Sequence, residues 1–181
     1  MRIVISAVAI VFIIWFLTAI LGAETPTREE GATRAIAVLY PTGGNGASGS
    51  VRFIQADHGV RVVAQLHGLT PGPHGFHIHQ YGDCSAPDAS SAGGHFNPTG
   101  APHAGPDTGK RHLGDLGNII ADETGNAYLD VVDHLLTLEG PNGIVGRAVV
   151  LHAGADDLTS QPSGAAGPRI ACGVIGIAGR E

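Results

Sequence analysis

The feature that most limits the fold of this chain is a series of short, strand-like segments that begins at residue 33. These segments are rich in β-branched residues, alternate in part between apolar and polar positions, and show no helical periodicity. They cover residues 33–40, 50–56, 60–69, 75–80, 117–121, 126–132, 144–153 and 169–177. Turn signals separate them, such as "ADHGV" and "DETGN", and the chain has 28 Gly and 11 Pro. The pattern predicts an all-β domain, an antiparallel sandwich or barrel, over residues 33–178.

Two stretches do not read as strands. Residues 81–116 and 153–168 are rich in Gly, Pro and Ser and are too long for ordinary connections. Loops of this length inside a compact domain are usually functional or disordered, and these two contain several histidines and aspartates. We therefore expect any site to lie on them.

The N-terminus predicts export. Arg2 precedes an apolar run over residues 3–21, and the chain turns polar at residue 24. Residues 1–23 are thus predicted to be a cleaved signal peptide or an uncleaved membrane anchor, because the run approaches the roughly 20 residues that span a bilayer. Residues 24–32 are then a linker and residues 179–181 a tail. Both cysteines fall in the exported part, periplasmic or extracellular, where a disulfide is favoured over two free thiols.

Charge limits the partners. Charged residues are 14% of the chain and the formal net charge is −6, which argues against nucleic acid as a partner. An anionic substrate would need a local positive spot on this protein.

The segment "GFHIHQ" predicts a pair of metal ligands on one strand. On a strand, His77 and His79 point to one face while Phe76 and Ile78 point into the core. A third imidazole, His152, ends a strand of its own, and three nitrogen ligands of this kind suit copper. For an isolated His-x-His the alternative is a pair of polar residues on a solvent face.

The first long loop adds a second candidate ligand set. Its members are three imidazoles and one carboxylate, which is a shell that holds structural zinc. They are His95, His103, His112 and Asp115. The alternative is a loop with incidental histidines, which is a poor explanation for a chain with 10 of them.

Several motifs, in this order and spacing, resemble the copper/zinc superoxide dismutases over residues 33–178. They are "GFHIHQYGDC", "GGHFNP", "RHLGDLGN", "VVLHAGADDL" and "PRIACGVIGIA". The resemblance implies a Greek-key β-sandwich or barrel of immunoglobulin-like architecture. Because Cys84 directly follows Asp83, the spacing resembles some bacterial members, and this leaves open whether the chain is a monomer or a homodimer.

The resemblance also implies a role for each site residue. The copper ligands would be His77, His79, His95 and His152. The zinc ligands would be His95, His103, His112 and Asp115, so that His95 would bridge the two metals as an imidazolate. Cys84 and Cys172 would form a disulfide, and Asp156 or its neighbour Asp157 would accept hydrogen bonds from His77 and His103. Arg111 and Asp133 match positions that pair in relatives.

The implied activity is disproportionation of superoxide to oxygen and hydrogen peroxide, with copper and zinc as cofactors and His95 and Arg169 as catalytic residues. Arg169 would attract the anion, with help from Lys110 and Arg111, because the loop after Asp157 carries no charge before Arg169. The competing hypothesis is a non-catalytic copper and zinc buffer or delivery protein of the cell envelope. Arg169 favours the enzyme, since a buffer needs no anion guide.

Overall fold

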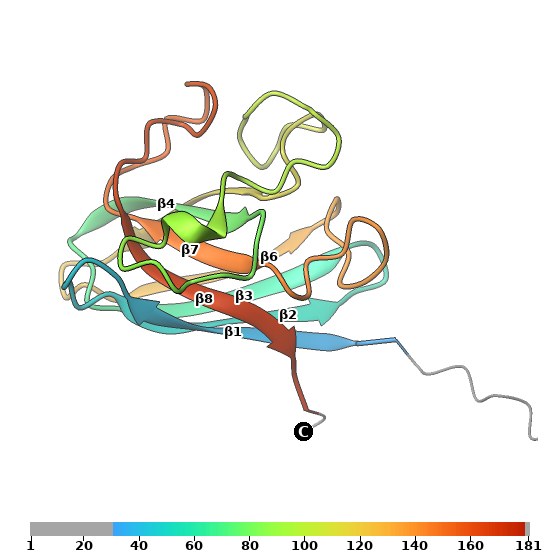
Figure 1. The fold of residues 1–181 in the computed structure, drawn as a ribbon, viewed down its shortest axis with the longest axis horizontal. Helices are drawn as coiled ribbons and strands as arrows, with labels where there is room; N and C mark the ends of the chain where they lie inside the picture. Colours follow the sequence, from blue (N-terminus) through green and yellow to red (C-terminus); the bar gives the residue numbers. More distant parts are fainter. Residues whose placement is uncertain (1–30, 180–181) are drawn as a thin grey trace, which may run out of the picture. The chain divides into compact units, whose positions relative to one another are not determined.

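The strands of this chain close into an antiparallel barrel (Figure 1). The computed structural model describes residues 31–179. The strands follow one another around the barrel in the order β1-β2-β3-β6-β5-β4-β7-β8. Their bounds are β1 Arg34–Pro41, β2 Ser48–Gln55, β3 Val60–His67, β4 Gly72–His79, β5 Asp115–Ala121, β6 Ala127–Asp133, β7 Ala148–His152 and β8 Arg169–Ile177. Closure pairs every strand on both sides, so this part of the chain leaves no open sheet edge.

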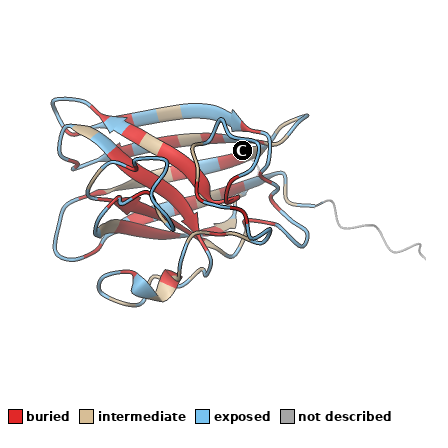
Figure 2. Ribbon diagram, turned by 90° about the horizontal axis from the view of Figure 1, so that it is seen from above, coloured by how far each residue is buried: buried red, intermediate tan, exposed pale blue. Residues whose placement is uncertain are grey.

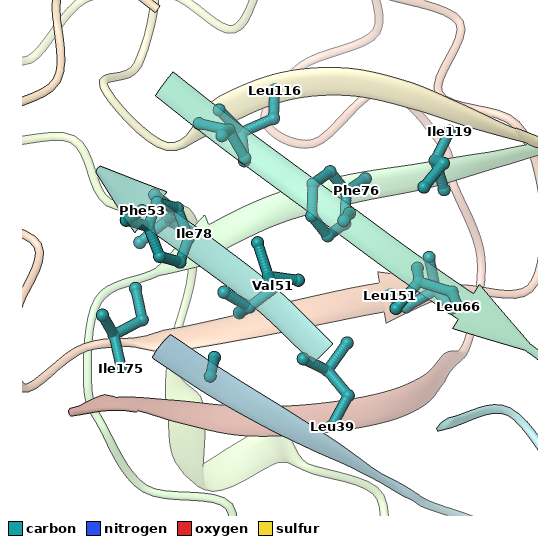
Figure 3. Close-up of a cluster of buried hydrophobic side chains, with 14 of the residues drawn as sticks. Leu39, Val51, Phe53, Leu66, Phe76, Ile78, Leu116, Ile119, Leu151 and Ile175 are labelled. Atoms are coloured by element: carbon teal, nitrogen blue, oxygen red, sulfur yellow. The ribbon is translucent and has the colours of Figure 1, made fainter. Parts of the chain in front are cut away.

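One apolar cluster fills the barrel. The side chains of Phe53, Phe76 and Ile78 are fully buried in it, and Figure 3 shows them facing Leu39 and Leu151 from other strands. In Figure 2 the buried residues gather on the strands, whereas the connections are mostly exposed. The expected inward direction of Phe76 and Ile78 is confirmed.

Tight turns join the first strands. Ala56 donates its N–H to the carbonyl of Gly59 in the β2–β3 hairpin. Gly59 has φ of 96°, and a Cβ at this position would lie 2.1 Å from the carbonyl oxygen of Asp133. Only glycine fits this turn, since a side chain would be both strained and blocked.

Both long connections were predicted, with one shift of boundary. The loop between β7 and β8 covers residues 153–168 as expected, but the first loop ends at Gly114 because Asp115 already pairs with His77 in β5. This first loop contains a short 3-10 turn, η1 (Ser90–Ala92). Figure 1 shows both loops on the β4 side of the barrel.

The predicted strand over residues 144–153 was too long at its start. β7 begins at Ala148, because Gly146 adopts φ of 85° and Arg147 donates its N–H to the carbonyl of Ile144 in a turn. β-Branched residues alone do not show where such a turn interrupts the run.

The predicted signal or anchor segment, residues 1–23, lies outside the described residues. Within residues 31–179, no helix is long and apolar enough to span a bilayer.

Candidate metal centre

Strand register brings the predicted ligands together. His77 on β4 lies opposite Asp115 on β5, and the register of this pair shifts between Gly75 and His77. His152 on β7 lies opposite Arg169 on β8, again beside a register shift. Bulges of this kind re-aim side chains next to functional sites. An isolated bridge between His79 and His95 draws the first loop onto the same end of β4.

A close approach of backbone completes the assembly. Gly114 accepts a hydrogen bond from the N–H of Ile78, and Phe96 donates its N–H to the carbonyl of Ile78. A Cβ on Gly114 would lie 2.1 Å from that carbonyl oxygen. Glycine therefore allows the first loop to press against β4, which positions the loop ligands beside the strand ligands.

The first ligand cluster consists of four imidazoles whose candidate ligand nitrogens lie within 4.8 Å of one another. Its members are His77, His79, His95 and His152. His79 donates its Nδ1–H to the carbonyl of Gly93 at 2.9 Å, and His152 donates its Nδ1–H to the carbonyl of Gly167 at 3.0 Å. Each bond leaves Nε2 as the free nitrogen, and these two Nε2 atoms lie 3.4 Å apart.

Burial keeps three of these imidazoles, those of His77, His79 and His152, neutral. It lowers the pKa of His77 and of His152 to about 4, and it lowers the pKa of His79 well below its ordinary value. Neutral imidazole is the form that binds a metal ion, so at neutral pH protons do not compete for these three ligands.

The second cluster converges on one carboxylate oxygen. Oδ1 of Asp115 lies 2.8 Å from His95 Nδ1, 3.0 Å from His103 Nδ1 and 3.2 Å from His112 Nδ1. These ligand atoms also lie within 4.8 Å of one another. Although burial raises the pKa of Asp115, hydrogen bonds from His95 and from the N–H of Ala104 prevail and hold it at about 2. The carboxylate is therefore ionised, as a cation ligand must be.

The unpaired atoms in these clusters fit metal ions. Among the described residues, the buried side-chain atoms without a hydrogen-bond partner are His77 Nδ1, His95 Nε2, His103 Nδ1 and His112 Nδ1. An unpaired buried polar atom is costly, and all of these atoms point into the two clusters. Imidazole nitrogens suit copper, and three imidazoles with a carboxylate suit tetrahedral zinc.

His95 belongs to both clusters. Its Nδ1 lies 2.8 Å from Asp115 Oδ1, whereas its Nε2 has no partner among the described residues, and its ring centroid lies 4.0 Å from that of His77. One ring thus offers a nitrogen to each cluster, as the bridge expected from the sequence requires.

Asp156, and not Asp157, links the two clusters by accepting a hydrogen bond from one histidine of each. Its Oδ2 accepts from His77 Nε2 at 2.8 Å and its Oδ1 accepts from His103 Nε2 at 2.9 Å. Asp157 is exposed and accepts instead from Ser160 and Thr159 of its own loop. The alternative that the sequence left open is therefore resolved by contact.

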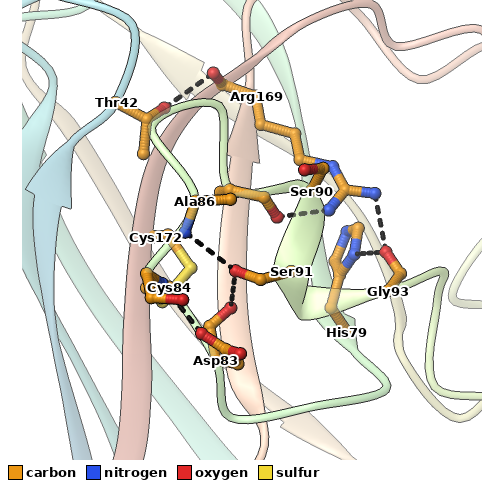
Figure 4. The surroundings of a disulfide bond; sticks show 12 residues. Thr42, His79, Asp83, Cys84, Ala86, Ser90, Ser91, Gly93, Arg169 and Cys172 are labelled. Carbon is orange, nitrogen blue, oxygen red and sulfur yellow. Dashed lines mark hydrogen bonds between the residues drawn. A yellow bond between two sulfur atoms is a disulfide. The ribbon is translucent and has the colours of Figure 1, made fainter.

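Arg169 lines the entrance to the first cluster. A cleft of about 450 Å³ is bordered by Arg169, His79, His95 and His152, with Ser163 among its other borders. The guanidinium donates to the carbonyls of Ala89 at 2.5 Å and Gly93 at 2.6 Å. Figure 4 shows it beside Gly93 and His79. A positive charge therefore stands next to the candidate copper ligands.

The predicted disulfide is confirmed. Cys84 of the first loop is bonded to Cys172 of β8, with 5.8 Å between their Cα atoms (Figure 4). The bond ties the segment that accepts the Arg169 hydrogen bonds to the strand that carries Arg169.

The expected contribution of Arg111 to anion attraction was wrong, although its pairing with Asp133 is confirmed. Arg111 is buried, donates to Asp133 at 2.5 Å and donates to the carbonyl of His112 at 2.9 Å. A buried, paired charge does not draw anions from solvent. Lys110 is exposed and no contact ties it to the cleft.

Sequence reasoning missed His74. This residue is buried, and it donates its Nδ1–H to the backbone carbonyl of His152 at 2.8 Å. It therefore holds the backbone of a candidate copper ligand. Its position on β4, three residues before His77, was the available signal.

Known proteins share this arrangement. The family model "Copper/zinc superoxide dismutase (SODC)" matches residues 47–175. The chain is 45% identical to the extracellular copper/zinc superoxide dismutase of Brugia pahangi over 152 residues, covering 79% of this chain and 75% of the relative. It is 45% identical to the corresponding protein of Onchocerca volvulus over 160 residues, covering 82% and 78%.

A solved structure agrees in fold. The crystal structure of the clock protein EA4 superposes with a TM-score of 0.75 at 45% identity, over 81% of this chain and 96% of that one. The two curated relatives are nematode proteins, so they do not support the bacterial subtype that the cysteine spacing suggested. The chain belongs to the copper/zinc superoxide dismutase family, and it is an enzyme that disproportionates superoxide with copper and zinc as its cofactors.

Proposed function

We propose that this dismutase works outside the cytoplasm, with His95 joining the copper and zinc sites and Arg169 drawing superoxide into the cleft. The observation that carries the proposal is the shared ring of His95, which offers Nδ1 to one cluster and Nε2 to the other.

The reaction fixes what the chain must provide. Two superoxide anions and two protons give one oxygen molecule and one hydrogen peroxide. Bound copper supplies the one-electron redox chemistry, while zinc keeps its oxidation state. The chain must hold its ligands rigidly, attract an anion to a net-negative protein, and deliver protons.

We assign the first two tasks to separate residues. Asp156 holds His77 and His103 through its two oxygens, so the ligands of both sites share one support. Arg169 supplies the attraction, because a guanidinium stays charged at any working pH and offers several donors to a small oxygen anion.

Proton delivery falls to His95. His95 borders the cleft, and its Nε2 has no hydrogen-bond partner within residues 31–179. Nε2 would carry a proton only while it is not bound to copper, and a proton held there is within reach of a product that leaves through the same cleft. We assign His95 this second role.

Export is supported by two observations. The disulfide between Cys84 and Cys172 is favoured in oxidising compartments, and the relatives are named as extracellular enzymes. We propose that residues 1–23 direct export, either as a cleaved signal or as an anchor, and that the catalytic domain covers residues 33–178.

We also propose that the chain forms a homodimer. Val38 on β1 and Val174 and Ile177 on β8 expose apolar side chains on paired strands, with 46%, 45% and 68% of their surfaces accessible. Sedimentation at micromolar concentration tests this, and a monomer throughout would remove the proposal.

The enzymatic proposal is tested by following superoxide decay directly. The full chain, loaded with copper and zinc, is assayed with excess EDTA so that loosely held copper contributes nothing. We expect decay that is first order in protein. His152→Ala should abolish it, while His67→Ala, an exposed histidine outside both clusters, should leave it unchanged. Decay no faster than with metal-free protein would refute the function.

A further inference from the structure

The two long loops meet at one side-chain amide beside the zinc cluster. Gln161, in the loop between β7 and β8, accepts a hydrogen bond from the backbone N–H of His103 at 2.8 Å. The amide nitrogen of Gln161 donates to the backbone carbonyl of His103, also at 2.8 Å, and to the carbonyl of Thr159 at 3.1 Å. Both hydrogens and the oxygen of this amide are thus engaged, although the residue is exposed.

This contact holds the backbone of a candidate metal ligand. His103 lies in a stretch without strand pairing, and the hydrogen bonds of its backbone N–H and carbonyl both go to Gln161. Its ring is held separately, because Nε2 donates to Asp156 at 2.9 Å. The direction of Nδ1, which points to Asp115, depends on where both the backbone and the ring are fixed.

The residues that follow Gln161 also lie against the zinc cluster or the copper cleft. Gly164 lies beside the hydrogen bond between His103 and Asp156. A Cβ on Gly164 would be 1.8 Å from Asp156 Oδ1 and 2.7 Å from His103 Nε2. Between them, Pro162 and Ser163 line the cleft that leads to the copper cluster. One short segment therefore contacts a zinc ligand on one side and borders the substrate entrance on the other.

We infer that Gln161 is a positioning residue for the zinc ligand His103. This inference rests on the proposed zinc role of His103. Gln161 contacts neither substrate nor metal and acts through the backbone it holds.

The test replaces the amide without changing the length of the side chain. Gln161→Met removes all three hydrogen bonds and keeps a similar shape. Loss of a residue that orients a metal ligand typically weakens binding by about 10- to 100-fold. Because Asp156 still holds the ring, we expect the lower end, an about tenfold loss of zinc affinity. Gln55→Met is the matched control, since the Gln55 amide also donates to backbone carbonyls, at Ala56 and Gly59, in the β2–β3 hairpin.

Zinc affinity is measured on the full chain by competition with a chelator, after the copper site has been loaded. Copper binding in each variant reports that the domain is folded. Co²⁺ is then placed in the zinc site, and its visible absorption reports ligand geometry. We expect weaker zinc binding and altered Co²⁺ bands for Gln161→Met alone.

Two other results are informative. Zinc affinity and Co²⁺ bands in Gln161→Met that equal those of the wild type would overturn the inference and leave the dismutase intact. A wild type that binds no zinc while binding copper would overturn the zinc assignment itself, and the role of Gln161 with it.

Discussion

At the scale of single residues, one carboxylate supports both metal sites. Asp156 accepts one hydrogen bond from a copper-cluster histidine and one from a zinc-cluster histidine. Although burial raises its pKa, the hydrogen bonds from His77, from the backbone N–H of Leu158 and from His103 together outweigh this, and the pKa is lowered on balance. The adjacent Asp157 contacts its own loop, so two neighbouring aspartates have different roles.

We predict that Asp156→Asn lowers zinc affinity by about 10- to 100-fold. Asparagine offers one acceptor oxygen, and its amide nitrogen opposes the N–H of one histidine ring. Asp157→Asn should leave zinc affinity within about twofold of the wild type, because Asp157 touches neither cluster. Chelator competition measures both variants, and equal losses would argue against the support by Asp156.

Arg169 carries a positive charge and also donates hydrogen bonds to two backbone carbonyls of the first loop, and substitutions separate these two roles. Arg169→Lys keeps the charge but lacks the planar fork that reaches Ala89 and Gly93 together. Guidance by charge predicts that Lys retains most of kcat/KM, that Ala loses about tenfold, and that Glu loses more. Stopped-flow superoxide decay measures these rates, and metal content checks that both metals remain bound.

Salt provides the check on this interpretation. Exposed charges are screened beyond a Debye length of about 8–10 Å near physiological ionic strength. The wild-type rate should fall modestly as salt rises, and the rate of Arg169→Ala should fall less. A steep salt dependence that survives in the Ala variant would move the attraction to another part of the molecule.

At the scale of elements, β8 is the strand that positions Arg169 at the entrance to the copper cleft. It carries Arg169 at its start and Cys172 three residues later, and the disulfide joins it to the first loop near the carbonyls that hold Arg169. Thr42, next to β1, donates its hydroxyl to the carbonyl of Arg169 at 2.7 Å (Figure 4). The backbone of Arg169 is thus held by strand pairing, by Thr42 and by the nearby disulfide, so its guanidinium does not depend on a loop for its position.

Breaking the disulfide should therefore affect stability and the entrance together. The cross-link spans 88 residues, for which loop-closure entropy gives about 4.6 kcal/mol of stabilisation. Cys84→Ser should lower the free energy of unfolding of the metal-free protein by up to that amount, as measured by chemical denaturation. Reduced wild type serves as the control and should match the variant. A loss below about 1 kcal/mol in both would show that packing holds the loop without the bond.

At the scale of the whole molecule, the barrel and both clusters follow from sequence patterns. Strand alternation placed His77 and His79 on one face and Phe76 and Ile78 in the core, because side-chain direction in a strand is a local property. The loop ligands were found by residue type and by resemblance to a family. Residue type and resemblance could both be read from the sequence without knowing how the loops fold.

What the sequence did not show depends on contacts between distant segments. The burial of Arg111 depends on Asp133 at the end of β6, and the choice of Asp156 over Asp157 depends on which one faces His77. The contact between Gln161 and His103 joins residues 58 positions apart. Such side chains carry no periodic signal, since their partners are set by how loops fold over the strands.

The bridge at His95 is tested most directly by the copper spectrum before and after zinc is removed. If one ring binds both metals, selective zinc removal from the wild type must change the electron paramagnetic resonance spectrum of Cu²⁺, because His95 then loses one of its cations. In His95→Ala, zinc removal should leave the copper spectrum unchanged. A wild-type copper spectrum that does not respond to zinc would contradict the shared ligand, and with it the two-metal site proposed for this enzyme.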